Sequence, residues 1–351
     1  MTRLDELIIA QLTAAIPARE DKVTATGVVF TDPHGALLQH LLQRCDQVIV
    51  GARTYQQAET AAATATALES RHRVTIAGFD ASLRLDQLLS HADTPLIAAT
   101  HLPKSLAELN YYAQALAARR AGAPVTLVAG GNNKHMTRNQ NTILTQAFAR
   151  VRASRGQGKF RCLQAETPQE IADYQPVRGE LWAVGGVFSG TNADHGGNLL
   201  ATHAVRDLLS VGELPGPIID LGCGNGSVAR AINAALPDAR IIATDTAADA
   251  IESARLNVPQ VELVWDHSAQ SLPDAEASAV LLNPPFHAGT TVDPTMVQGL
   301  LAAAHRLLRP SGVLYLVHNS HLRYRALLAE SFRDVTQLGR DRRFTVLRAQ
   351  V

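Results

Sequence analysis

The stretch Pro217-Ile-Ile-Asp-Leu-Gly-Cys-Gly-Asn-Gly226 decides the fold of the C-terminal half of the chain. Its apolar beginning predicts a buried strand, and the glycines after it predict a tight turn whose backbone approaches a ligand closely. The segment Ser227–Ala235 is predicted as a helix, and its free N–H groups would face the same ligand. The order of strand, glycine turn and helix is typical of α/β folds that bind a nucleotide-like molecule.

Two acidic residues indicate which chemical groups the ligand carries. Asp220 lies before the glycines, where a carboxylate would repel a pyrophosphate and suit a cationic amino-acid portion. Asp245 ends the next predicted strand, where it can accept hydrogen bonds from both ribose hydroxyls. A nucleoside triphosphate is disfavoured because the turn lacks the lysine of a phosphate loop. A helix-capping aspartate is the alternative interpretation of Asp220.

The most specific motif is Asn283-Pro-Pro-Phe286, directly after the predicted strand Val280–Leu282. Ligands bind at this carboxyl edge of open α/β sheets. The side-chain oxygen of Asn283 and the carbonyl of Pro284 form an acceptor pair suited to an exocyclic –NH₂ group, while Pro285 stiffens the turn. Phe286 offers a flat face on which a base stacks, with about 1–3 kcal/mol. The alternative is a simple strand-terminating turn.

The N-terminal half repeats the plan of the C-terminal half. The segment QVIVGARTYQQA (47–58) resembles RIIATDTAADA (240–250), and APVTLVAGGNN (123–133) matches SGVLYLVHNS (311–320). Apolar runs alternate with helical patterns in both halves, which predicts parallel sheets covered on both faces. A helix is also predicted over His321–Phe332. The first copy lacks the glycine turn, so we expect it to recognise a substrate rather than to bind a cofactor.

Composition sets the broad class of the protein. The chain has 351 residues, 46% of them hydrophobic and 18% charged, with a formal net charge of +0, as expected for a packed globular protein. No apolar run approaches the roughly 20 residues of a membrane span. Three cysteines without a CxxC spacing predict neither disulfides nor a metal site. A reducing cytoplasmic location follows as the expectation.

Basic and acidic residues are unevenly distributed along the chain, although their total numbers are equal. No Asp or Glu occurs from Leu109 to Ala165, and this stretch is predicted to join the two domains and to attract a polyanion. The candidate contacts to RNA phosphates are Arg150, Arg152, Arg155, Lys159 and Arg161. An exposed hairpin with solvated charges is the alternative.

Two motifs of the C-terminal half resemble those of a known enzyme family. The motifs Asn283-Pro-Pro-Phe-His287 and Gly186-Val-Phe-Ser189 resemble those of bacterial ribosomal RNA guanine-N2 methyltransferases of the small-subunit type C and large-subunit type G. Those enzymes are class I S-adenosylmethionine-dependent methyltransferases. The resemblance implies an α/β fold of two tandem Rossmann-like methyltransferase domains. Residues 1–178 would form the degenerate, RNA-recognising domain, and residues 179–351 the catalytic domain.

The resemblance also implies roles for individual residues. The methionine end of the cofactor would be lined by Asp220, Gly222, Gly224, Asn225 and Gly226. Asp245 would hold the ribose, Asp266 would lie by the adenine amino group, and Asp194 keeps a cofactor-facing pattern. The target guanine would be held by Asn283, Pro284, Pro285 and Phe286, with His287 beside it as a candidate RNA or proton contact. Gly190 departs from the family, which has an arginine there.

The activity implied by the resemblance is transfer of a methyl group from S-adenosyl-L-methionine to the exocyclic N2 of a guanine in ribosomal RNA. The expected enzyme is a monomer that uses no metal and no membrane. One alternative is a protein glutamine N-methyltransferase, since a side-chain amide is also a planar –NH₂ group. Those enzymes usually have a tyrosine where this chain has Phe286, and a small helical N-terminal domain. The other alternative is a non-catalytic RNA-binding assembly factor with a methyltransferase fold.

Overall fold

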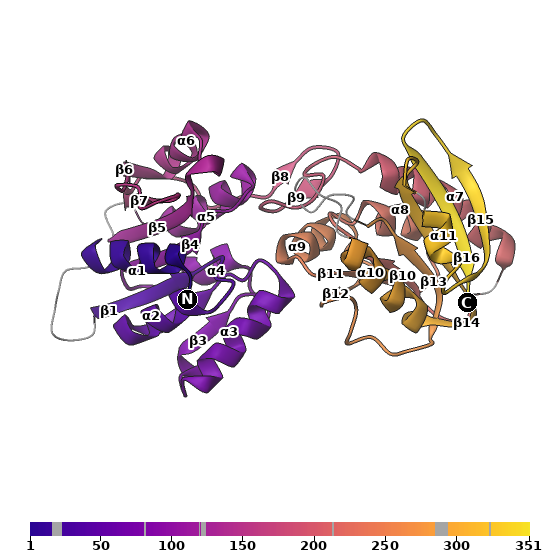
Figure 1. The fold of residues 1–351 in the computed structure, drawn as a ribbon, viewed down its shortest axis with the longest axis horizontal. Helices are drawn as coiled ribbons and strands as arrows, with labels where there is room; N and C mark the ends of the chain where they lie inside the picture. Colours follow the sequence, from indigo (N-terminus) through magenta and orange to yellow (C-terminus); the bar gives the residue numbers. More distant parts are fainter. Residues whose placement is uncertain are drawn as a thin grey trace. The chain divides into compact units, whose positions relative to one another are not determined.

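The computed structural model describes residues 1–15, 23–80, 82–118, 120, 124–212, 214–284, 294–322 and 324–351. They form two compact units, Met1–Pro176 and Val177–Val351 (Figure 1). Among these residues, no helix combines the length and the apolar character that a membrane crossing requires.

The N-terminal unit alternates helices and strands. Its helices are α1 (Arg3–Ala15), α2 (Ala36–Arg44), α3 (Tyr55–Ala67), α4 (Leu85–Ser90), α5 (Leu106–Ala117) and α6 (Arg138–Ala147), with the 3₁₀ turns η1 (Arg71–Arg73) and η2 (Asn133–His135). Its strands are β1 (Val23–Val29), β2 (Cys45–Val50), β3 (Val74–Ile76), β4 (Leu96–His101), β5 (Val125–Asn132), β6 (Phe148–Ala153) and β7 (Phe160–Pro168). Side-chain caps define two of the helix starts: Thr54 and Ser105 accept backbone N–H groups of α3 and α5.

The C-terminal unit follows the same alternation. Its helices are α7 (His195–Val211), α8 (Ser227–Ala235), α9 (Ala248–Asn257), α10 (Pro294–Leu307) and α11 (Tyr324–Leu328). Its strands are β8 (Val177–Arg178), β9 (Trp182–Ala183), β10 (Ile218–Leu221), β11 (Ile241–Asp245), β12 (Glu262–Trp265), β13 (Ala277–Leu282), β14 (Leu308–Asn319), β15 (Arg333–Arg340) and β16 (Phe344–Gln350).

Within the described residues, each unit contains one seven-stranded sheet with the same topology. The strand order is β3-β2-β1-β4-β5-β7-β6 in the first unit and β12-β11-β10-β13-β14-β16-β15 in the second. The first five strands of each order pair in parallel, and the last two pair antiparallel. The predicted duplication of one α/β unit is therefore confirmed. In the second sheet, β11 and β12 lie on one side of β10, and β13 and β14 lie on the other. Folds of this kind bind ligands at the point between β10 and β13 where the strand order changes side.

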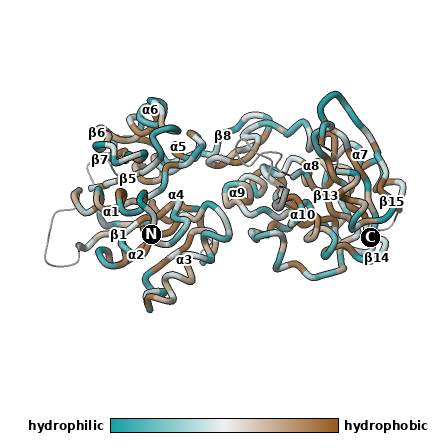
Figure 2. The backbone as a smooth tube through the Cα atoms, in the orientation of Figure 1, coloured by the Kyte–Doolittle hydropathy of each residue, from teal (hydrophilic) through white to brown (hydrophobic). Residues whose placement is uncertain are grey.

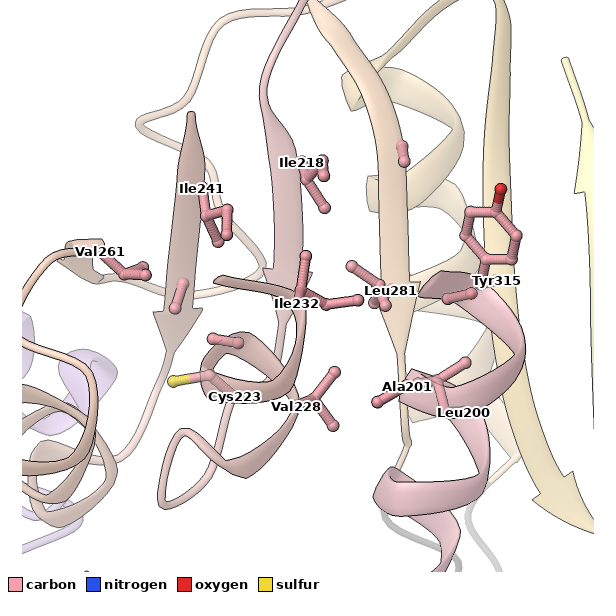
Figure 3. Packing of buried hydrophobic residues seen from close by; sticks show 14 of the residues in the cluster. Leu200, Ala201, Ile218, Cys223, Val228, Ile232, Ile241, Val261, Leu281 and Tyr315 are labelled. Carbon is pink, nitrogen blue, oxygen red and sulfur yellow. The ribbon is translucent and has the colours of Figure 1, made fainter. Parts of the chain in front are cut away.

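The central strands of the second unit pack against helices α7 and α8 in one hydrophobic core. In Figure 3, Ile218, Leu281 and Tyr315 of the sheet lie in one cluster with Ile232 of α8 and Leu200 of α7. Every residue of β13 is buried, and Figure 2 shows this strand as a hydrophobic segment. Because side chains alternate along β10, Asp220 faces the same side of the sheet as Ile218. The carboxylate thus lies next to the start of α8.

Two local predictions are wrong. The basic segment 150–161 does not join the domains but belongs to the antiparallel strands β6 and β7 and the turn between them, so the hairpin alternative is confirmed, within the first unit. Strand β6 ends the sheet, and an edge strand tolerates charged side chains on its solvent face. The helix predicted over His321–Phe332 covers only α11, because Phe332 leaves the helix to fill the core at 5% exposure before β15 begins.

Candidate active site

The glycine turn between β10 and α8 leaves its backbone open to a ligand. Gly222, Gly224 and Gly226 have φ angles of +83°, +53° and +81°, a region that disfavours other residues. A Cβ placed on Gly222 would meet no atom of the described residues within 4 Å, whereas one on Gly226 would lie 3.0 Å from Ala254 of α9. Gly222 therefore faces free space, and Gly226 allows close packing of α9.

Two carboxylates lie beside this turn. Oδ2 of Asp220 accepts the backbone N–H of Ala229 at 3.0 Å, and Oδ2 of Asp245 accepts that of Gly224 at 2.9 Å. Burial raises the pKa of Asp220 to about 7, and the charge of nearby Asp245 adds to the shift. Burial also raises the pKa of Asp245. Asp220 does cap α8, as the alternative interpretation requires, but two crowded carboxylates also favour a cationic ligand over an anionic one.

Two other predicted cofactor contacts hold local structure. Nδ2 of Asn225 donates to the carbonyls of Gly190 and Asn192 at 3.0 and 2.9 Å, which ties the loop before α7 to the glycine turn. The carboxylate of Asp266 accepts hydrogen bonds from the backbone N–H groups of His267 and Ser271. Contact of Asn225 or Asp266 with a cofactor stays a prediction.

Asn283 follows β13, and its amide has a defined orientation. Nδ2 of Asn283 donates to Oδ2 of Asp194 at 2.8 Å, and Asp194 also accepts the N–H of Gly197 as the N-cap of α7. The other amide atom, Oδ1 of Asn283, is buried and has no hydrogen-bond partner among the described residues. A buried acceptor without a donor is costly, so this oxygen is available for a ligand N–H group. Pro284 is buried beside it, whereas Pro285, Phe286 and His287 lie outside the described residues.

The structure adds contacts that sequence reasoning missed. Oδ2 of Asp249 accepts the N–H of Gly186 at 2.7 Å and so anchors the loop that leads to Phe188. The Phe188 side chain is 62% exposed, and its Cδ1 lies 3.9 Å from a Cβ placed on Gly224. An exposed aromatic ring therefore borders the open side of the glycine turn. The motif Gly186-Val-Phe-Ser189 was the available signal, but it marks a loop and gives no partner.

The predicted RNA contacts lie in the N-terminal unit, on β6, β7 and the turn between them. Arg150 and Arg152 both pair with the carboxylate of Glu166, at 3.0 and 3.2 Å. No ion pair of Arg155, Lys159 or Arg161 occurs with the other described residues. RNA contact by these five residues stays a prediction. Among all the residues that the structure describes, no group of three or more His, Cys, Asp or Glu side chains has an arrangement that could hold a metal ion.

Comparison with known proteins places the chain in a family. One family model, the methyltransferase small domain, matches residues 178–348, and another, the RLMG N-terminal domain, matches residues 4–169. The ribosomal RNA large subunit methyltransferase G of Pseudomonas entomophila is 31% identical over an alignment that covers 99% of this chain and 92% of that protein. The chain belongs to the ribosomal RNA large subunit methyltransferase G family.

A second relative and a solved structure are also similar to this chain. The protein of that name from Alcanivorax borkumensis is 32% identical over 71% of this chain and 66% of its own length. Among solved structures, the T. Thermophilus 16S rRNA N2 guanine methyltransferase, in complex with AdoMet and guanosine, covers 99% of this chain with a TM-score of 0.72 at 18% identity. That likeness shows the fold. The resemblance drawn from the Asn283-Pro-Pro-Phe286 motif is thus confirmed.

Proposed function

We propose that this chain transfers a methyl group from S-adenosyl-L-methionine to the exocyclic N2 of a guanine in ribosomal RNA. The observation that carries the proposal is Oδ1 of Asn283 at the carboxyl end of β13, which is buried and has no hydrogen-bond partner among the residues that the structure describes. Membership of the methyltransferase G family supports the reaction class, and the names of the relatives support ribosomal RNA as the substrate.

The residues around the glycine turn fit the cofactor. A sulfonium and an ammonium group are both cationic, and the crowded carboxylates Asp220 and Asp245 would gain from a cation between β10 and β11. The open space over Gly222 leaves room for the methionine portion. Asp245, at the end of β11, would hold the ribose hydroxyls. When bound, the cofactor supplies an activated methyl group, so the protein must mainly align the acceptor with it.

Asn283 would hold the target amino group. Its Oδ1 and the carbonyl of Pro284 would each accept one N–H of guanine N2, which draws the nitrogen lone pair out of conjugation and toward the methyl group. Asp194 fixes this geometry because it holds Nδ2, so the amide cannot turn its oxygen away. Asp194 would then act as a positioning residue for Asn283, in place of the cofactor contact predicted from the sequence.

The remaining parts of the proposal rest on the same site. The N2 proton becomes acidic once the methyl group has transferred, so it would pass to solvent or to His287, the candidate proton contact, and no strong base is needed. Phe286 would stack on the guanine, which must leave its own stack to enter the site. The N-terminal unit, as the RNA-recognising domain, would bring the RNA to the enzyme. We also propose that the reaction takes place in the cytoplasm and that the enzyme is a monomer.

Incubation of the full chain with methyl-tritiated S-adenosylmethionine, ribosomal RNA and ribosomal protein tests the substrate class. We expect the label in the RNA fraction, and only when the RNA is present. Label in protein would favour the glutamine alternative, and failure to bind S-adenosylmethionine in calorimetry would favour the non-catalytic assembly factor.

A further inference from the structure

A groove in the N-terminal unit has the composition of a nucleotide site. It has a volume of about 370 Å³ and lies between the η2–α6 segment and strands β6 and β7. Met136 and Leu163 give it an apolar lining, and Asn133, Asn141, Arg138 and Arg161 give it amide and guanidinium groups. The volume falls within the range of about 300–1,000 Å³ that is usual for small-molecule sites.

The hairpin β6–β7 separates this groove from the cations paired with Glu166. Arg150 lies opposite Glu166, and Arg152 lies opposite Gln164, so these four side chains share one face of the hairpin. Gln164 on that face also bonds to Gln11 of α1. Because side chains alternate along a strand, Arg161 and Leu163 point to the opposite face, which is the groove face.

The groove face carries positive charge without compensation. Its lining residues lie within the stretch from Leu109 to Ala165, which contains no Asp or Glu. Among the described residues, no carboxylate pairs with Arg138 or Arg161. A Cβ placed on Gly156 of the β6–β7 turn would lie 3.6 Å from Nη2 of Arg161 and 3.7 Å from Nδ2 of Asn133, so the guanidinium and the amide border the same end of the hairpin.

We propose that this groove binds one unpaired nucleotide of ribosomal RNA, with its phosphate on Arg138 and Arg161; the proposal rests on the proposed function. A guanidinium matches phosphate oxygens with two parallel hydrogen bonds. The base would lie against Met136 and Leu163, with Asn133 and Asn141 at its polar edge. A hollow of this size admits a splayed-out nucleotide but not a duplex, and unpaired bases are what proteins usually recognise in RNA.

Two double variants of the full chain test the proposal. Arg138→Gln/Arg161→Gln changes the groove, and Arg150→Gln/Arg152→Gln makes the same change in charge on the other face of the hairpin. Binding of a fluorescein-labelled single-stranded oligoribonucleotide is measured by anisotropy as a function of salt. We expect the groove variant to bind at least tenfold more weakly, with a log–log salt slope smaller by about 0.7 for each phosphate that the variant no longer neutralises. Because the carboxylate of Glu166 holds Arg150 and Arg152, the proposal replaces the phosphate contact predicted for them from the sequence, and the matched variant should bind within twofold of the parent.

Three results would overturn the proposal: equal decreases in affinity in both variants, a larger decrease in the Arg150/Arg152 variant, or no decrease in either. Duplex RNA of the same length should not distinguish the groove variant from the parent protein beyond twofold, and a larger difference would also contradict a single-nucleotide site. The titration contains no S-adenosylmethionine and measures no methyl transfer, so its outcome is independent of the proposed catalytic function. Thermal melting and S-adenosylmethionine calorimetry of each variant report whether the two units remain folded.

Discussion

The two units have the same sheet but differ at the ends of their strands. Helices α2 and α8 both begin after a glycine with positive φ, Gly35 at 71° and Gly226 at 81°. At the same distance before these glycines, the first unit has Val29 and the second has Asp220. Both copies place a carboxylate on the first turn of this helix, since Asp32 accepts the N–H of Leu38 as Asp220 accepts that of Ala229, but only in the second copy does that carboxylate come from the strand.

The two units also differ at the end of the neighbouring strand, which is β2 in the first unit and β11 in the second. The register of β1 with β2 and of β10 with β11 places Ala52 where the second unit has Asp245. Val29, Gly35 and Ala52 line a cavity of about 10 Å³, which holds no more than a water molecule. Asp32 also lines this cavity, so the first unit keeps one carboxylate here but lacks a second one and lacks the space for a cofactor.

A supporting hydrogen bond is present in both copies. In the first, Oδ1 of Asp5 near the start of α1 pairs with Nε2 of His101 at the end of β4, at 2.6 Å. In the second, Asp194 at the start of α7 holds Asn283 just past β13. Both copies fix a polar side chain at this edge, and in the second copy the held amide has an oxygen, Oδ1 of Asn283, without a partner among the described residues. At these positions, the two copies differ in a few side chains at the strand ends and not in the strands that carry them.

The largest effect is expected at Asn283. Asn283→Ala removes the proposed acceptor of the amino group and should lower kcat for methyl transfer by about 10³-fold, since a preorganised hydrogen bond is worth about 10²–10³ in rate. Cofactor affinity by calorimetry should stay within a few-fold of the parent. Parallel losses of turnover and cofactor affinity would assign Asn283 a structural role.

Asp194→Ala tests whether Asp194 positions Asn283. Without its acceptor, the amide of Asn283 is free to rotate, so we expect kcat to fall by about 10²-fold while the Kd for S-adenosylmethionine changes little. Stopped-flow or steady-state kinetics with calorimetry separates the two quantities. A Kd increase as large as the decrease in kcat would instead support Asp194 as a cofactor contact.

Asp245→Ala tests the ribose contact and, with a matched control, the contrast between the copies. Loss of hydrogen bonds to a charged acceptor costs about 1.5–3 kcal/mol, so the Kd for S-adenosylmethionine should rise by about 10- to 100-fold. Asp32→Asn in the first unit, whose carboxylate accepts the N–H of Leu38, should leave that Kd within twofold. A large effect of Asp32→Asn would mean that the first unit also binds the cofactor.

The smallest effect concerns pH. Because the pKa of Asp220 is raised to about 7, its carboxyl group is mostly neutral at pH 5.5, and ionisation lowers the stability of the ligand-free protein as pH rises from about 4 to about 7. A cationic ligand prefers the ionised form, so cofactor affinity should rise by about tenfold from pH 5.5 to pH 7. In Asp220→Asn the rise should be much smaller. An equally steep profile in that variant would assign the titration to another group.

The sequence predicted the parts of the site that depend on local patterns. Gly222–Gly226 and the acids Asp220 and Asp245 stand at strand ends, where apolar runs stop, and the structure places them together around one turn. Asn283 was predicted for the same reason. These positions are readable because a buried parallel strand has a continuous apolar signal that ends abruptly.

Contacts between distant segments could not be predicted in this way. The bond from Asn283 to Asp194 joins residues 89 positions apart, and Asn225 bonds to carbonyls of Gly190 and Asn192, which have no sequence signal. The sequence left a connector and a hairpin open for residues 150–161, because the exposed, arginine-rich strand β6 lacks the apolar alternation of a half-buried strand. The pairing of Arg150 and Arg152 with Glu166 likewise depends on strand register.

The central claim is that the second unit directs methyl transfer to guanine N2. Ribosomal RNA is incubated with the full chain and S-adenosylmethionine, digested to nucleosides and analysed by mass spectrometry against methylguanosine standards. We predict N2-methylguanosine as the product, absent when Asn283→Ala replaces the parent protein. Methylation of a ring nitrogen, of adenine or of a ribose hydroxyl would contradict the account.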